Sequence, residues 1–155
     1  MRIKIDLIDN LEHTEVIIRC KKIDDDILKL EELVKNLKKS KTLLSFYKDN
    51  KEYYLSLDNI LFFETDGNFI YAHTKDDSYL VKNKLYELEQ ILPNNFLRVS
   101  KSTILNINQI LSITRNFPST NLVEFSKSHK VVYVSRFYYK LLDMKLQERR
   151  NYEKY

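Results

Sequence analysis

The second half of the chain carries basic side chains that alternate with hydroxyl and amide side chains. Its isolated cations are Arg98, Lys101, Arg115, Lys127, Lys130, Arg136 and Lys140. Lysine and arginine neutralise phosphates and read guanine edges, whereas serine, threonine and asparagine donate hydrogen bonds to phosphate oxygens. This pattern favours contact with a polyanion, and DNA or RNA is one interpretation of it.

The formal net charge of +4 is unevenly distributed along the chain. Residues 98–155 contain eleven Lys/Arg and four Asp/Glu, a balance of +7, whereas residues 1–97 contain fifteen and eighteen, a balance of −3. A solvated tail does not explain the difference, because the second half keeps +4 without Arg149, Arg150 and Lys154. The asymmetry therefore supports a surface that faces a polyanion.

The remaining residue types give no support to catalysis. The single glycine, Gly67, excludes a glycine-rich phosphate loop. The three histidines lack the spacing of metal ligands, and His73 is predicted to be a surface or groove side chain on a strand. The run Asp24–Asp26 indicates a helix start rather than an acid/base pair. We therefore expect no catalytic residues, no metal site and no cofactor.

No apolar run approaches the roughly 20 residues that cross a bilayer, and the first ten residues interleave charge with apolar side chains. We therefore expect a cytoplasmic protein. The single cysteine, Cys20, excludes a disulfide framework, and its apolar neighbours Val16, Ile17 and Ile18 predict a buried thiol.

Hydrophobic periodicity predicts a mostly β, α+β protein. An appendage of residues 1–41 is expected to hold strands at 1–9 and 15–21 and a helix of about 14 residues after Asp24–Asp26. A domain of residues 42–146 follows, with a polar tail at 147–155. Its expected strands cover 43–48, 52–57, 61–64, 69–74, 79–82, 103–105, 110–114, 122–125 and 131–134, with helices at 85–92 and 138–145. Gly67 lies in the turn Thr65–Asn68, where we expect a positive φ.

Several motifs of the larger domain resemble the LytTR family of bacterial DNA-binding domains. The matching segments are Ile60–Glu64, Gly67–Phe69, Leu85–Glu89, Leu92–Ser102, Ile104–Asn106 and Val134–Tyr138. The most specific patterns are PxxFxRxxKSxxxN, beginning at Pro93, and the closing VSRxYxKxL pattern, which appears here as VSRFYYKLL. The resemblance covers residues 42–146.

This resemblance implies a fold of about ten mostly antiparallel strands with little helix. It also implies that loops, rather than a recognition helix, enter two successive major grooves of double-stranded DNA. Carried over to this chain, the base contacts are Asn68, Lys101 and Arg136. The phosphate contacts are Ser100, Ser102, Lys127, Lys130 and Ser135.

Each of these assignments has an alternative. Arg136 could pair with a carboxylate, Lys101 could contact phosphate, and Asn68 could be only a turn residue. Many family members carry a histidine in place of Ser100, so the target site of this chain is expected to differ from theirs.

Other residues in the motifs are expected to be structural. Arg98 is predicted to pair with a carboxylate such as Glu64, and Asn106 to form a turn. The core is predicted to contain the aromatic residues Phe62, Phe63, Phe96, Phe117 and Phe125. The segment 116–121 is predicted to be an exposed turn.

The sequence therefore predicts a transcriptional regulator that binds double-stranded promoter DNA at repeated half-sites. Residues 1–41 are too short for a phosphorylated receiver domain of roughly a hundred residues, and their apolar face is expected either to pack on the domain or to form a homodimer, which we favour. The resemblance also suggests an inhibitory membrane protein as a partner. Two alternatives are a protein–protein adaptor module that has kept the fold and an RNA-binding regulator, although the aromatic signature of an RNA-recognition motif is missing.

Overall fold

The computed structural model describes residues 15–39, 44–115 and 120–152. The chain divides into two compact units between Lys38 and Lys39. The described residues contain no helix that is long and apolar enough to cross a membrane.

The first unit contains the predicted helix, α1 (Asp25–Lys39). Asp24 precedes it and caps it, because its Oδ1 accepts a hydrogen bond from the backbone N–H of Ile27 at 3.2 Å. The strand predicted at 15–21 does not form, and Cys20 is exposed rather than buried. Apolar β-branched residues become a strand only where a partner strand pairs with them, and none of the described residues does so here. The strand predicted at 1–9 lies outside the described residues.

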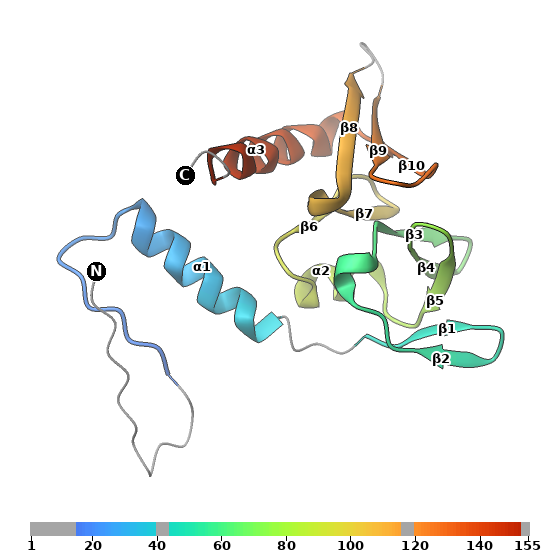
Figure 1. The fold of residues 1–155 in the computed structure, drawn as a ribbon, viewed down its shortest axis with the longest axis horizontal. Coiled ribbons are helices and arrows are strands. Elements are labelled where there is room, and N and C mark those ends of the chain that lie inside the picture. Colours follow the sequence, from blue (N-terminus) through green and yellow to red (C-terminus); the bar gives the residue numbers. More distant parts are fainter. Residues whose placement is uncertain (1–14, 40–43, 116–119, 153–155) are drawn as a thin grey trace, which may run out of the picture. The chain divides into compact units, whose positions relative to one another are not determined.

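The larger sheet of the second unit has seven strands, in the order β2-β1-β5-β4-β3-β7-β6 (Figure 1). Their bounds are β1 Phe46–Lys48, β2 Lys51–Tyr53, β3 Phe62–Asp66, β4 Phe69–His73, β5 Ser78–Val81, β6 Phe96–Arg98 and β7 Thr103–Asn106. Every neighbouring pair is antiparallel. Short helices η1 (Leu57–Asn59), α2 (Leu85–Ile91) and η2 (Ile107–Gln109) connect the strands.

The smaller sheet has three antiparallel strands in the order β10-β9-β8. They are β8 (Ile110–Arg115), β9 (Asn121–Phe125) and β10 (Val131–Val134), and α3 (Arg136–Tyr152) follows β10. Ten strands in antiparallel sheets confirm the predicted fold class.

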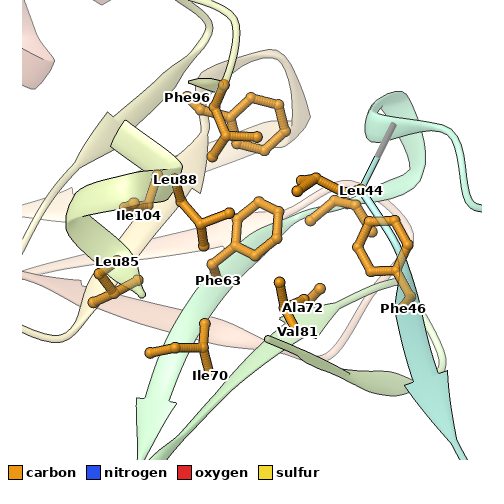
Figure 2. Close-up of a cluster of buried hydrophobic side chains, with 12 residues drawn as sticks. Leu44, Phe46, Phe63, Ile70, Ala72, Val81, Leu85, Leu88, Phe96 and Ile104 are labelled. Atoms are coloured by element: carbon orange, nitrogen blue, oxygen red, sulfur yellow. The ribbon is translucent and has the colours of Figure 1, made fainter. Parts of the chain in front are cut away.

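Two hydrophobic cores lie on opposite faces of β3. Successive side chains of a strand point to opposite faces, so the neighbours Phe62 and Phe63 enter different cores. Phe63 packs with Phe96 and with Leu88 of α2 in the first core (Figure 2). Phe62 packs with Phe125 of β9 in the second core, which also contains Leu142 of α3. The four described aromatic residues predicted in the core are therefore buried, whereas Phe117 lies outside the described residues.

Two element predictions for the second unit were also wrong. Strand β6 was not predicted, and α3 begins at Arg136 and continues to Tyr152 through most of the expected polar tail. Tertiary contacts explain the longer helix. Leu146 packs against the second core, and Arg149 donates a 2.9 Å hydrogen bond to the carbonyl of Ile107.

Asn106 forms a turn, as the sequence predicted, and its side chain is buried. Its Oδ1 accepts from the Asn108 backbone N–H at 3.1 Å and from Asn95 Nδ2 at 2.8 Å, and its Nδ2 donates to the Ile60 carbonyl at 3.0 Å. All these partners are on connecting segments, so this side chain holds the loops at one end of β7 together.

His73 packs into the fold, with a side chain that is 19% exposed. Its ring stacks on Phe62 with 4.3 Å between centroids, and its buried Nδ1 has no hydrogen-bond partner. Burial first, and then the charge of Lys130, lower the pKa of His73 to about 4. The described residues contain no group of His, Cys, Asp and Glu side chains that could hold a metal ion.

The low pKa of His73 predicts a loss of stability in mild acid. The unfolded chain binds a proton near pH 6.5 and the folded chain only near pH 4, so stability falls as pH drops through this window. From pH 7 to pH 5 we expect a decrease of at most about 2 kcal/mol in the free energy of unfolding. Urea denaturation at both pH values measures it.

His73→Phe keeps a ring against Phe62 and should remove this loss, whereas His129→Gln, at an exposed histidine, should retain it. An equal loss in His73→Phe and in the wild type would show that His73 is not the responsible group.

Candidate nucleic-acid interface

Three connecting segments meet at one edge of the second unit. They are the β3–β4 turn at 67–68, the β6–β7 loop at 99–102 and the β10–α3 junction at Ser135. Thr65 N–H donates to the Ser102 carbonyl at 2.8 Å, and Ser135 N–H donates to the Val99 carbonyl at 3.0 Å. The β6–β7 loop is therefore bonded to the end of β3 that leads into the β3–β4 turn and to the β10–α3 junction.

The β3–β4 turn presents Asn68 to solvent. Asp66 pairs with Phe69 across the turn, and Gly67 adopts φ +59°, which confirms the predicted positive φ. A shallow depression of about 250 Å³ beside the turn is lined by Asn68, Phe69, Ile70, Leu80, Val81, Lys82, Asn83 and Lys84. Lys82 and Lys84 were not predicted as site residues, although the run Val81–Lys84 between a predicted strand and a predicted helix was a usable signal.

Arg98 holds the β6–β7 loop in place. Its Nε donates to the Ser100 carbonyl at 2.6 Å, and its Nη2 donates to the carbonyl of Lys101. Its Nη1 donates to Glu89 Oε2 at 2.8 Å. A planar guanidinium can make these contacts together because its donors have fixed directions.

The structural role predicted for Arg98 is confirmed, but the partner predicted for it, Glu64, is wrong. In the register, Arg98 lies opposite Ile104, which lies opposite Phe63. Arg98 therefore points to the face that α2 covers, whereas Glu64, the next residue after Phe63, points to the other face. There Glu64 lies 3.6 Å from His73 Nε2, and burial, followed by repulsion from Asp66, raises its pKa.

The loop orders its two serine hydroxyls and leaves Lys101 exposed. Ser102 N–H donates to Ser100 Oγ at 3.2 Å, and the two hydroxyl oxygens lie 3.4 Å apart. The loop thus presents a cation between two hydroxyl groups.

Arg136 is the first residue of α3. The Ser135 carbonyl accepts from Tyr138 N–H at 3.2 Å and from Tyr139 N–H at 3.0 Å, which fixes the start of the helix. A cation is disfavoured at this end of a helix by the helix dipole. Arg136 is exposed, and among the described residues no carboxylate forms an ion pair with it. The alternative interpretation, in which Arg136 pairs with a carboxylate, therefore finds no support among the described residues.

Lys127 and Lys130 lie beyond the far end of β10, and Lys130 is five residues, or about 16 Å along the strand, from Ser135. Lys127 is exposed with φ +58°, whereas Lys130 donates to the Asp77 carbonyl in the β4–β5 turn. Ser128 donates to the Lys75 carbonyl of the same turn at 3.1 Å. Burial lowers the pKa of Lys130. The structure thus brings six of the eight predicted site residues to one edge and places these two elsewhere.

The anchoring role of Arg98 predicts that Arg98→Lys loosens the β6–β7 loop, because a lysine ammonium cannot reproduce the planar fork. Losing two hydrogen bonds that together contribute about 1–3 kcal/mol should speed amide hydrogen exchange at Ser102 and Thr65 by roughly 10- to 100-fold. Residue-resolved exchange measures this effect.

Glu89→Gln is the matched control, because it removes the ion pair but leaves both bonds from Arg98 to the loop. Its exchange rates at Ser102 and Thr65 should stay near those of the wild type. Unchanged rates in Arg98→Lys would mean that the loop is ordered without the guanidinium.

Comparison with known proteins gives the family. The model of the LytTr DNA-binding domain matches residues 50–147. An uncharacterized HTH-type transcriptional regulator of Staphylococcus aureus strain NCTC 8325 / PS 47 is 30% identical over 145 residues, which cover 92% of this chain and 97% of the relative. Another from strain MRSA252 is 32% identical over 105 residues, 66% of this chain and 71% of the relative.

A solved LytTr DNA-binding domain from Bacillus cereus has the same fold, with a TM-score of 0.63 and 23% identity over 68% of this chain and 97% of that domain. The names of the relatives refer to a helix-turn-helix, but the three α-helices in the described part of this chain are separated by β-strands. The chain thus belongs to the LytTR family of DNA-binding domains.

Proposed function

We propose that this protein is a transcriptional regulator that binds double-stranded DNA in a sequence-specific manner, with the edge loops of its second unit in successive major grooves. The observation that supports this most is that Asn68, Lys101 and Arg136 are exposed at one edge, where backbone hydrogen bonds join the β6–β7 loop to the end of β3 and to the β10–α3 junction. The proposed activity is binding alone, without a catalytic residue, metal ion or cofactor. Its site of action is the bacterial cytoplasm, where chromosomal DNA lies.

The proposed base readers are Asn68, Lys101 and Arg136. All three are exposed, and each is on a different segment of the edge. Arginine can bind a guanine through two hydrogen bonds, and asparagine can bind an adenine in the same way. The exposed carboxylate of Asp66 beside Asn68 repels phosphate, so this turn is better suited to base edges than to the DNA backbone.

The spacing of these readers supports contacts in separate grooves. Neighbouring strands lie about 4.8 Å apart, and four such spacings separate β4 from Ser135, by way of β3, β7 and β6. The span is therefore on the order of 20 Å. This span exceeds the roughly 12 Å width of one major groove. Asn68 and Arg136 are therefore proposed to enter different groove segments, with Lys101 between them.

The proposed phosphate contacts are Ser100, Ser102 and Ser135 at the edge, and Lys127 and Lys130 beyond it. The hydroxyls of Ser100 and Ser102 already lie together beside Lys101. Lys127 and Lys130 require DNA that extends past the edge, and Lys130 must give up its contact with the β4–β5 turn. Lys82 and Lys84 add exposed cations beside Asn68.

We also propose that the protein binds repeated half-sites as a homodimer. The support is an apolar row on α1, with Ile27, Leu30 and Val34 at positions i, i+3 and i+7, together with exposed Leu28 and Leu33. Two-fold symmetric proteins on half-sites one helical turn apart are a common arrangement. An inhibitory membrane protein is the proposed source of the regulatory signal, and it is supported only by the family resemblance.

The base-reading assignment predicts that Arg136→Ala and Lys101→Ala change sequence preference and not only affinity. Loss of a two-bond contact with guanine should reduce discrimination at one operator position by about 10- to 100-fold, or about 1–3 kcal/mol. Arg136→Lys keeps the charge and should still lose most of this discrimination. Selection from a random DNA library, followed by titration of single-base operator variants, gives the measurement. Wild-type preferences in both alanine variants would refute the assignment.

The phosphate-contact assignment predicts a steep dependence of affinity on salt. A plot of log K against log[salt] should lose about 0.9 from its slope for each cation removed from a phosphate. Lys84→Ala should show this loss, whereas Lys35→Ala should not, because Lys35 lies on α1, outside the DNA-binding domain, and pairs with Glu31 at 2.5 Å. Fluorescence anisotropy between 50 and 300 mM salt, a range of about sixfold, is sufficient to resolve one contact.

The same titration separates the competing functions. No affinity for double-stranded DNA at low salt would favour a protein–protein module. Displacement of the bound DNA by single-stranded RNA would favour an RNA-binding regulator.

A further inference from the structure

We propose that two exposed phenylalanines, Phe69 and Phe137, read thymine methyl groups in the major groove. This inference rests on the proposed function. It adds an apolar component to the recognition by polar readers, and it names the bases that the operator should contain.

The exposure of Phe137 has no structural explanation. Its side chain is 84% exposed, and it belongs to neither hydrophobic core. Its ring contact is the edge of Tyr138, with 5.0 Å between centroids. Helix α3 packs on the second core through Leu142, so truncation of Phe137 leaves that packing in place. Burial of an aromatic ring lowers the free energy, and the exposed ring of Phe137 does not gain this stabilisation in the free protein. We therefore expect a partner to cover it.

Phe69 has the same relation to the proposed interface. It is 57% exposed, follows Asn68 directly and lines the depression beside the β3–β4 turn. Phe137 likewise follows Arg136 directly. Each aromatic ring therefore accompanies a polar reader, at opposite ends of the same edge.

The chemistry of the major groove explains this pairing. Thymine carries the only methyl group among the four bases, at C5, and apolar side chains contact it. The proposed phosphate contacts and the lysines beside Asn68 bring the edge to the charged backbone. A ring next in sequence to a base reader is then expected to lie near the base edges. We therefore expect thymines next to the bases that Arg136 and Asn68 contact.

A protein partner is the competing explanation, because Phe137 continues into an exposed apolar row on α3 with Leu141 and Met144. Phe69 argues against it. It lies on a different element outside that row, and what it shares with Phe137 is the position beside a base reader on the same edge. DNA accounts for both rings, whereas a partner on the α3 row accounts for one.

The test replaces each thymine of the operator with deoxyuridine, which removes the C5 methyl and leaves the pairing edges intact. The operator is first selected from a random double-stranded library with the full chain, and dissociation constants are then measured for each substituted duplex. The wild type should lose about three- to tenfold in affinity at particular thymines, as expected for one buried methyl group.

The variants Phe137→Ala and Phe69→Ala assign each methyl to a ring. Each should bind the thymine operator three- to tenfold more weakly than the wild type and should be insensitive to deoxyuridine at its own position. Phe137→Leu should recover part of the sensitivity. Leu141→Ala, one helical turn further along α3, is the matched control and should keep the wild-type response at every position.

Three results would overturn the inference. In the first, no replacement of a thymine by deoxyuridine changes the affinity of the wild type for its operator. In the second, the affinity of Phe137→Ala responds to deoxyuridine at the same positions as that of the wild type. The third is an equal loss in Phe137→Ala and Leu141→Ala together with a smaller sedimentation coefficient, which would assign the row to a protein interface. If the selection enriches no double-stranded DNA, the proposed function fails before any methyl group is tested, so the two failures are distinguishable.

Discussion

The backbone of Val99 joins the two halves of the DNA-binding unit. Its N–H donates to the Thr103 carbonyl at 3.0 Å, which closes the β6–β7 loop, and its carbonyl accepts from Ser135 N–H at 3.0 Å. Its side chain is fully buried in the second core. Val99 therefore contacts the β6–β7 loop, the second core and the residue that precedes α3 at the same time. A helix start displaced from Val99 would carry Arg136 away from Lys101, so the interface depends on this junction.

Most of the fold could be predicted because periodicity is a local property. The two-residue turn at Asp49 and Asn50, both with positive φ, lies between strands β1 and β2 as predicted. The errors came where long-range contacts decide the structure. Residues 15–21 have the composition of a strand but no partner among the described residues, and the polar end of α3 is helical because Arg149 and Leu146 are anchored by tertiary contacts.

The residues of the proposed site could be named from the sequence, but their arrangement could not be derived from it. Motif resemblance identified Asn68, Lys101 and Arg136, and it could not show that Lys130 is bonded to the β4–β5 turn. Arg98 pairs with a residue of α2 and not with Glu64, because the side chain of Glu64 points to the face of the sheet that α2 does not cover. The face to which a strand residue points depends on the register of strand pairing, and the sequence alone does not give that register.

A β fold that reads DNA with loops places an unusual demand on its frame. A recognition helix keeps its readers on one element, whereas the three readers proposed for this chain lie on three segments across a span on the order of 20 Å. Their spacing is set by the sheet register, by the Arg98 fork and by the Val99 junction. Interiors pack as closely as crystals and transmit strain. The specificity proposed for this chain thus depends on the packed frame as much as on the side chains that are proposed to reach the bases.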